Sequence, residues 1–311
     1  MIMKCKVCGS TSLEKVNTYK HFWYACASCD SIEREKKSHY TFESFFPKSA
    51  VKKLPGYFTY LLPASYFEEA KLGTSYNYYA DMGNSAEGSG TKWGGETKIV
   101  SERLSKFGVN IKDKSVLDVS GGPGFVANNL RSETSYMLLT EFSQVAVEGM
   151  RKFLAIDIEK YDYNSDSLDK ITGKKFDIIL VRFSINFCND LEKFVKEAKN
   201  LLNPDGLIYV EHVEPNRGCL LRWQFDEYTY TLLHGIKTFA ETFNKQGMST
   251  IKQEVLFEEK YNKPYWNYQG FKIKVFYFFI RRIRDVYKMK MGNKIKGDLI
   301  QRSWVSIFKL N

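Results

Sequence analysis

The stretch "DVSGGPGFVANNL", residues 118–130, decides the fold class of this chain. It continues an apolar run, "SVL" at 115–117, and then places three glycines and a proline within four residues before a new apolar segment begins at Phe125. Glycine tolerates a left-handed backbone and lets a ligand approach without a Cβ in the way. The pattern therefore predicts a buried strand, a glycine-rich turn and a helix in succession. At such a turn we expect free backbone amides and the helix N-terminus to face the negatively charged end of a cofactor.

Apolar runs and helical segments alternate after this turn. Strands are predicted at 135–143, 153–158, 176–187 and 206–213, with helices at 95–108, 144–152 and 190–202 and a turn at 203–206. Alternation of this kind is typical of a doubly wound, mostly parallel sheet that helices cover on both faces. The second strand ends at Glu141, about 20 residues after the glycines, where an acidic side chain accepts hydrogen bonds from ribose hydroxyls. The third strand is expected to end near Asp157.

Two pairs of cysteines precede this core. Cys5 and Cys8 are separated by two residues, as are Cys26 and Cys29, and turn-forming residues follow each pair. Two such pairs can complete a closed, tetrahedral Zn²⁺ site, whose metal is structural because no position is left open for a substrate. The alternatives are free thiols, or a nearby histidine as the fourth ligand. We expect a zinc ribbon over 1–40, with a hairpin between the pairs.

Size, composition and charge narrow the class further. The chain has 311 residues, 43% of them hydrophobic, which is enough for one sizeable α/β domain. No apolar run reaches the roughly 18 residues of a membrane span, and the N-terminus lacks a secretory apolar stretch. We therefore expect a cytoplasmic protein. The net charge is +10, and 262–300 carries ten Lys or Arg against two Asp, which is 10 − 2 = +8.

The strand, turn and helix pattern resembles the class I S-adenosylmethionine-dependent methyltransferases over roughly residues 95–260. Asp118, Ser120, Gly122 and Gly124 occupy the places of that family's aspartate and alternating glycines, and Ser120 departs from the pattern. The segment at 176–211 matches the family's central strand, helix and L-x-P-x-G turn. The spacing at the turn disfavours the G-x-G-x-x-G of NAD-linked dehydrogenases.

The resemblance implies a Rossmann-like sheet of seven strands, the sixth at 249–259 and the seventh at 303–311, in a domain that spans 95–311. It also implies a set of cofactor-binding residues, with Glu141 on the ribose and Asp157 near the adenine. The predicted set is Asp118, Ser120, Gly121, Gly122, Gly124, Glu141, Asp157, Arg182 and Phe183.

The N-terminal cysteines make the chain similar to zinc-ribbon methyltransferases that act on sugars. "YNYYADMG" at 76–83 resembles the aromatic segment before their core, so 41–94 is expected to form a connector and active-site lid. Residues 224–248 echo their segment after the fifth strand. We expect Tyr78, Tyr79, Asp226, Tyr230 and His234 to bind the substrate. Phe187 stands where many relatives have histidine, and their Glu-His pair is not preserved. We expect no counterpart of their large C-terminal domain.

Methyl transfer to a hydroxyl or a carbon acid requires a base near the acceptor. His212 and its neighbour Glu211 lie just beyond the fifth strand, at the edge of the sheet where ligands bind. We expect His212 to be the base and Glu211 to orient it or to serve in its place.

The basic segment at 262–300 has helical spacing of apolar residues with arginines on other sides, so it predicts a basic amphipathic helix. It would pack on the body, or contact an anionic substrate, a lipid-linked glycan, the inner membrane surface or RNA. The favoured function is methylation of a small molecule or glycan, such as a sugar nucleotide in surface-polysaccharide biosynthesis. The alternatives are an RNA methyltransferase and a non-catalytic binding protein with a decayed cofactor site.

Overall fold

The structure is a computed structural model that describes residues 3–17, 21–38, 97–122, 124–142, 144–152, 154–215, 232–260 and 300–311. The expected lid with Tyr78 and Tyr79, the substrate residues Asp226 and Tyr230, and nearly all of the basic insertion lie outside the described residues. The described parts form two compact units, one around the N-terminal sheet and one around a larger sheet.

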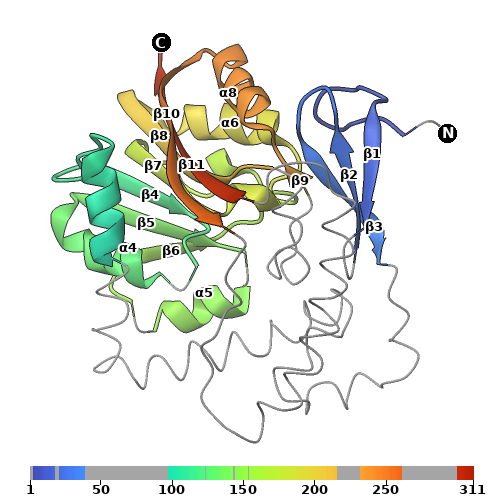
Figure 1. Cartoon of the computed structure of the whole chain (residues 1–311). Helices are drawn as coiled ribbons and strands as arrows, with labels where there is room; N and C mark the ends of the chain where they lie inside the picture. Colours follow the sequence, from blue (N-terminus) through green and yellow to red (C-terminus); the bar gives the residue numbers. More distant parts are fainter. Residues whose placement is uncertain are drawn as a thin grey trace, which may run out of the picture. The chain divides into compact units, whose positions relative to one another are not determined.

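The larger sheet has seven strands, in the order β10-β11-β8-β7-β4-β5-β6 (Figure 1). The strands β4 to β8 pair with one another in parallel. This confirms the predicted mostly parallel, Rossmann-like sheet, with β11 beside β10 as expected for the sixth and seventh strands. The strands are β4 Ser115–Val119, β5 Tyr136–Glu141, β6 Asp157–Lys160, β7 Phe176–Arg182, β8 Leu202–Val213, β10 Met248–Lys260 and β11 Ile300–Leu310.

The order reverses at β4, because β5 follows on one side and β7 on the other. Open α/β sheets bind ligands in the crevice beyond the carboxyl ends of their strands at such a switch point. The candidate functional site is therefore the edge where β4 and β7 end, at Val119 and Arg182.

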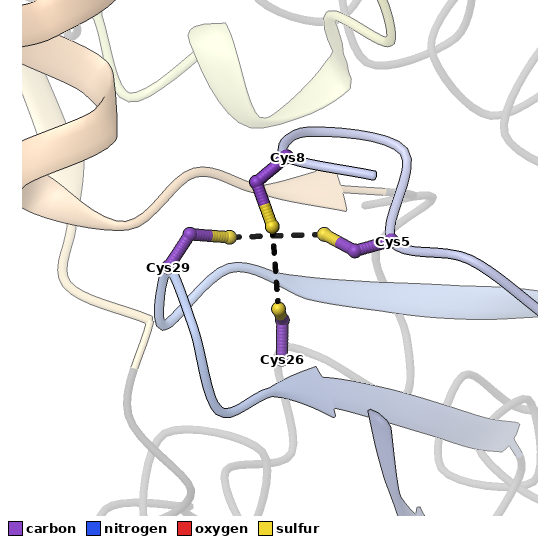
Figure 2. A group of neighbouring side chains, drawn as sticks. All are labelled: Cys5, Cys8, Cys26 and Cys29. Atoms are coloured by element: carbon purple, nitrogen blue, oxygen red, sulfur yellow. Dashed lines mark hydrogen bonds between the residues drawn. The ribbon is translucent and has the colours of Figure 1, made fainter. Parts of the chain in front are cut away.

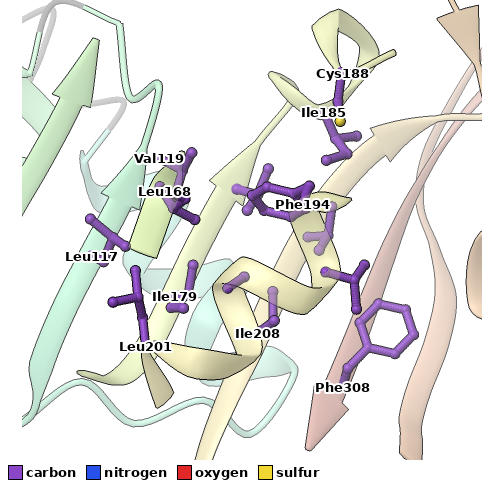
Figure 3. Packing of buried hydrophobic residues seen from close by; sticks show 14 of the residues in the cluster. Leu117, Val119, Leu168, Ile179, Ile185, Cys188, Phe194, Leu201, Ile208 and Phe308 are labelled. Carbon is purple, nitrogen blue, oxygen red and sulfur yellow. The ribbon is translucent and has the colours of Figure 1, made fainter. Parts of the chain in front are cut away.

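Buried apolar clusters cover both faces of the sheet. One face packs against the helix at 97–106, α4 and α5. The other packs against α6 and α8, and Figure 3 shows part of that cluster. In α6 the buried apolar residues Leu191, Phe194, Val195 and Ala198 recur at helical spacing, and Asp190 caps the helix by accepting from the Lys193 amide. The helices are α4 Phe125–Leu130, α5 Gln144–Met150, α6 Leu191–Asn200 and α8 Ile236–Lys245, with short 3₁₀ turns η3 Arg131–Glu133, η4 Leu168–Lys170 and η5 Ile185–Phe187.

Two predicted boundaries differ from the structure. The turn expected at 203–206 lies within β8, where the pairing of β7 with β8 shifts register between Phe176 and Ile178. The third parallel strand begins at Asp157 and does not end there, because the apolar run before it belongs to the connection that follows α5. This second difference changes one predicted site residue.

The smaller unit is a four-stranded antiparallel sheet in the order β1-β2-β3-β9. Its strands are β1 Leu13–Asn17, β2 His21–Cys26, β3 Ile32–Ser38 and β9 Leu232–Leu233. The β1-β2 hairpin lies where it was predicted. The strand β9 was expected in the methyltransferase domain, but it pairs with β3 and extends the N-terminal sheet. Within the described residues, no helix has the length and apolar character to cross a bilayer.

Candidate active site at the switch point of the sheet

The glycine-rich turn after β4 has a left-handed backbone at three positions. Ser120, Gly122 and Gly124 have φ angles of 52°, 67° and 72°. The amide of Ser120 donates to the Thr140 hydroxyl at 3.0 Å, and that of Gly121 donates to the Thr140 carbonyl at 3.3 Å. The expectation that the amides of this turn are free for a ligand is therefore wrong for these two, because β5 already occupies them.

Two glycines of the turn are required by close packing. A Cβ at Gly121 would lie 2.4 Å from the Asp118 carboxylate and 2.5 Å from Leu139, and a Cβ at Gly124 would lie 2.6 Å from Leu154. Heavy atoms do not approach so closely, so neither position accepts a side chain without rearrangement. The Asp118 carboxylate therefore lies directly against the backbone of the turn.

Asp118 and Arg182 form a buried ion pair between β4 and β7. Nη2 of Arg182 lies 2.6 Å from Oδ2 of Asp118, and Nε lies 3.4 Å from Oδ1. The Arg182 side chain is 12% exposed and the Asp118 side chain is 1% exposed. The structure thus brings together two predicted cofactor residues that are 64 positions apart in the sequence.

Glu211 continues this network on β8, beside Arg182 in the register of the two strands. Its carboxylate accepts from the Tyr209 hydroxyl at 2.9 Å and lies 3.4 Å from Nη1 of Arg103, in the helix at 97–106. Burial raises the pKa of Tyr209, and Glu211 raises it further. Arg103 pairs with Glu211 and Arg182 pairs with Asp118, so the formal charges of these four side chains cancel. Sequence reasoning missed Arg103, because no local pattern links it to a residue 108 positions away.

His212 does not lie where a base could reach a substrate. Its side chain is 1% exposed, its ring is stacked on Phe239 with centroids 4.4 Å apart, and its Nε2 is 2.9 Å from the Ser306 hydroxyl. Successive residues of a strand point to opposite faces, so His212 enters the cluster under α8 while Glu211 points to the other face. This packing contradicts the predicted general base, and we assign His212 to the core.

The acidic residues predicted to hold the ribose and the adenine lie at opposite ends of two neighbouring strands, β5 and β6. Glu141 ends β5 and is 5% exposed, and the next residue, Phe142, is 58% exposed. Asp157 begins β6, and its carboxylate accepts from the hydroxyl of Tyr136, the first residue of β5, at 2.7 Å. Asp157 therefore belongs to the amino edge and is removed from the cofactor site. Asp162, and not Asp157, follows the carboxyl end of β6, which ends at Lys160.

A second non-glycine residue of this site with a left-handed backbone directly follows β7. Phe183 has φ 56°, and its amide donates to the Glu211 carbonyl at 2.8 Å. Non-glycine residues in this region carry strain, and such strain concentrates at functional sites. The next residue, Ser184, donates to the Val119 carbonyl at 3.0 Å and lies 2.9 Å from the Tyr163 hydroxyl. Burial raises the pKa of Tyr163, while hydrogen bonds to the hydroxyls of Ser184 and Ser120 oppose the rise. The sequence did not single out Tyr163 or Ser184.

The carboxyl edge of the larger sheet thus combines two strained turns, a buried charge network and an exposed aromatic ring at the point where the strand order reverses. The family described as "Methyltransferase domain" matches residues 96–255, just over half of the chain. The chain belongs to this family. It is an S-adenosylmethionine-dependent methyltransferase, and the predicted enzyme class is confirmed.

Curated protein sequences gave no significant match. Among solved structures, a SAM-dependent methyltransferase from Archaeoglobus fulgidus aligns with 15% identity and a TM-score of 0.47, over 71% of this chain and 97% of that one. A putative sarcosine dimethylglycine methyltransferase from Galdieria sulphuraria aligns with 13% identity and a TM-score of 0.47, over 69% and 84%. The N-methyltransferase NodS from Bradyrhizobium japonicum aligns with 12% identity and a TM-score of 0.41, over 70% and 87%.

The four predicted zinc ligands of the methyltransferase lie together in the smaller unit (Figure 2). All four sulfurs lie within 4.8 Å of one another, with 3.7 Å between Cys5 and Cys29 and 3.6 Å between Cys8 and Cys26. Zn–S bonds of 2.3 Å at tetrahedral angles require sulfur separations of about 3.8 Å. The donor set and its spacing therefore fit a closed, four-thiolate Zn²⁺ site.

The predicted substrate residue His234 belongs to the same smaller unit. It is 6% exposed and follows β9, and the amide of the next residue, Gly235, donates to the Ser31 hydroxyl at 2.9 Å. A Cβ at Gly235 would lie 2.0 Å from the Cys29 carbonyl, so the chain passes directly against the second cysteine pair. The substrate role of His234 stays a prediction.

Proposed function

We propose that this methyltransferase acts on a small molecule or a glycan, and specifically on a sugar or a sugar nucleotide. The proposal rests on the joint presence of a methyltransferase core and an N-terminal sheet with two cysteine pairs, the combination that resembles zinc-ribbon sugar methyltransferases. The spacing of the four sulfurs supports the metal part of this resemblance.

Within the larger unit, we assign the cofactor to the carboxyl edge of β4 and β5. The buried pair of Asp118 and Arg182 holds the carboxylate against the glycine turn, and Glu141 stands at the end of the next strand. Phe142, which the sequence did not single out, offers an exposed ring beside Glu141 on which an adenine can stack. The observation that carries the assignment is that these groups meet where the strand order reverses.

Neither predicted base is suited to the chemistry in this arrangement. His212 is packed in the core, and the Glu211 carboxylate already accepts hydrogen bonds from Arg103 and Tyr209. We therefore assign Glu211 to holding the end of β8 beside Arg182. Transfer from a sulfonium is an in-line displacement, and the described residues contribute mainly by positioning the cofactor for it.

A labelled-methyl transfer screen tests the acceptor class. The full chain is incubated with S-adenosylmethionine carrying a labelled methyl group and with nucleotide sugars, glycans or RNA. We expect label in a sugar or a glycan. Transfer to RNA alone, with an affinity that falls steeply as salt is raised, would replace the proposal with the nucleic-acid alternative. Calorimetry that detects no binding of S-adenosylhomocysteine would favour a decayed cofactor site.

A further inference from the structure

The turn at 26–31, which carries the cysteines Cys26 and Cys29, contacts a segment about 200 residues later in the chain. That segment is residues 232–238, here called the β9 segment, and it belongs to the smaller unit together with the four cysteines. Its residue Leu233 is buried and lies opposite Ile32, the first residue of β3. The second cysteine pair is therefore followed directly by a strand that holds the β9 segment.

Two acceptors of this turn receive hydrogen bonds from the β9 segment. The Gly235 amide donates to the Ser31 hydroxyl at 2.9 Å, and the Thr238 hydroxyl donates to the Cys29 carbonyl at 3.4 Å. Ser31 is only 2% exposed, so water does not readily replace its bond to the Gly235 amide. One acceptor thus belongs to a predicted zinc ligand, and the other lies two residues after it.

Gly235 allows the two backbones to approach closely. A Cβ at this position would overlap the Cys29 carbonyl oxygen, and it would lie 3.1 Å from the carbonyl carbon. Both are backbone atoms, which cannot swing away as the end of a flexible side chain can. Any displacement of Cys29 therefore changes the surface on which Gly235 packs.

Backbone hydrogen bonds make residues 26–31 a single turn. The Asp30 amide donates to the Cys26 carbonyl at 3.1 Å, and the Cys26 amide donates to the Ser31 carbonyl at 2.9 Å. The acceptors on Cys29 and Ser31 are therefore fixed relative to the sulfur ligands of the same turn. A bound structural Zn²⁺ contributes its binding free energy to the folding of such a turn.

The start of α8 lacks two features that stabilise helix N-termini. The residue before the helix is Gly235, which has no side-chain oxygen to accept from the first amides, and the first turn contains no acidic residue. The later part of the helix has strong packing of its own. Phe239 stacks on His212 with centroids 4.4 Å apart, and Phe243 stacks on Phe308 at 3.7 Å. The two ends of α8 therefore depend on different contacts.

We propose that the zinc site is a metal-dependent clamp on the β9 segment and the first turn of α8. With the metal bound, the turn at 26–31 holds the segment through its contacts with Gly235 and Thr238. Loss of the metal releases the segment, while α8 stays packed from Phe239 onward. The β9 segment lies within the residues that match the methyltransferase family, so the clamp extends the effect of the metal beyond the N-terminal cysteines.

Hydrogen–deuterium exchange of the full chain, measured by mass spectrometry, tests the clamp. The zinc-loaded chain is compared with a chain from which a chelator has removed the metal under reducing conditions. We expect the amides of the β9 segment to exchange about tenfold faster without the metal, as in a segment that opens locally. The amides of β7 and α6 should keep their protection, because these elements pack in the core of the larger unit.

Two variants weaken the clamp and keep all four sulfur ligands, so both should retain one Zn²⁺ per chain. In zinc-loaded Ser31→Ala, the Gly235 amide should exchange about fivefold faster, the effect of losing one ordinary hydrogen bond. In zinc-loaded Gly235→Ala, the whole β9 segment should exchange like that of the metal-free chain, because the new methyl group overlaps the Cys29 carbonyl. Ser28→Ala is the matched control and should exchange like the wild type. The Ser28 hydroxyl lies in the same turn, but it is exposed and bonds to the Ser10 hydroxyl.

The outcomes separate the clamp from the proposed function. Unchanged exchange of the β9 segment after metal removal would overturn the clamp. A rise that extends equally to β7 and α6 would overturn it too, because the metal would then support the whole chain. Wild-type exchange in both zinc-loaded variants would contradict the contacts on which it depends. Binding of S-adenosylhomocysteine, measured by calorimetry, should not change in Ser31→Ala. A wild-type chain that binds none would refute the proposed function and leave the clamp standing.

Discussion

Replacing Arg182 by methionine should destabilise the protein far more than the loss of an ordinary salt bridge. The side chain is 12% exposed and its partner Asp118 is 1% exposed, so Arg182→Met would leave a carboxylate buried against the glycine turn with no cation 2.6 Å away. Removing one partner of a buried pair costs about 3–5 kcal/mol, because the remaining charge is uncompensated. At roughly 2–4 °C per kcal/mol for a domain of this size, the melting temperature should fall by about 6–20 °C.

The assay is thermal unfolding of the full chain, with Lys98→Met as the control. Lys98 forms an ion pair with Glu102 at 3.9 Å, and both side chains are more than 60% exposed, so its loss should cost less than about 1 kcal/mol. The double variant Asp118→Asn with Arg182→Met should recover part of the stability, because it removes the stranded charge. The reasoning fails if the effects of the two substitutions simply add, or if Arg182→Met unfolds within 2 °C of the control.

Three other substitutions or treatments give direct outcomes. Gly121→Ala places a Cβ 2.4 Å from a carboxylate oxygen and should abolish cofactor binding. A Cβ at Gly122 would have no atom within 4 Å, so Gly122→Ala should cost only about 1 kcal/mol of stability, from backbone strain. Equal cofactor binding by the two variants would refute the packing argument. Elemental analysis should find one Zn²⁺ per chain. The zinc content should fall in Cys26→Ser and stay the same in Cys188→Ser. A chain that is purified in the presence of zinc and holds no metal would contradict the site. His212→Ala should reduce the free energy of unfolding by about 2–4 kcal/mol, because a stacked, buried ring is lost. Turnover per folded molecule should stay within a few-fold of the wild-type value. A thousandfold loss of turnover would restore the assignment of His212 as the base.

Most of the fold could be predicted from the sequence, because local patterns specify its strands and helices. The buried parallel strands β4, β5 and β7 read as apolar runs, and α6 shows apolar residues at helical spacing. The boundary at Asp157 was misread because "FLAIDI" at 153–158 reads as one apolar run, although only its last two residues belong to β6. Apolar content alone does not reveal where such a run enters the sheet.

The cysteine pairs illustrate a site that the sequence predicts well. Each pair contributes two ligands through one tight turn, so most of the geometry is local, and only the meeting of the two turns depends on the fold. The strand β9 is the opposite case. Two leucines at 232–233 carry no signal that they pair with β3, some 200 residues earlier.

The sequence by itself determined the strand-turn-helix pattern, the position of the glycine turn and the cysteine spacing, since each depends on residues close together in the chain. Only the tertiary structure decided which polar groups are already occupied. It placed His212 against Phe239, paired Arg182 with Asp118, and directed two amides of the turn to Thr140. The physical reason is that a side chain's availability depends on partners that lie far away in the chain, and no local periodicity encodes them.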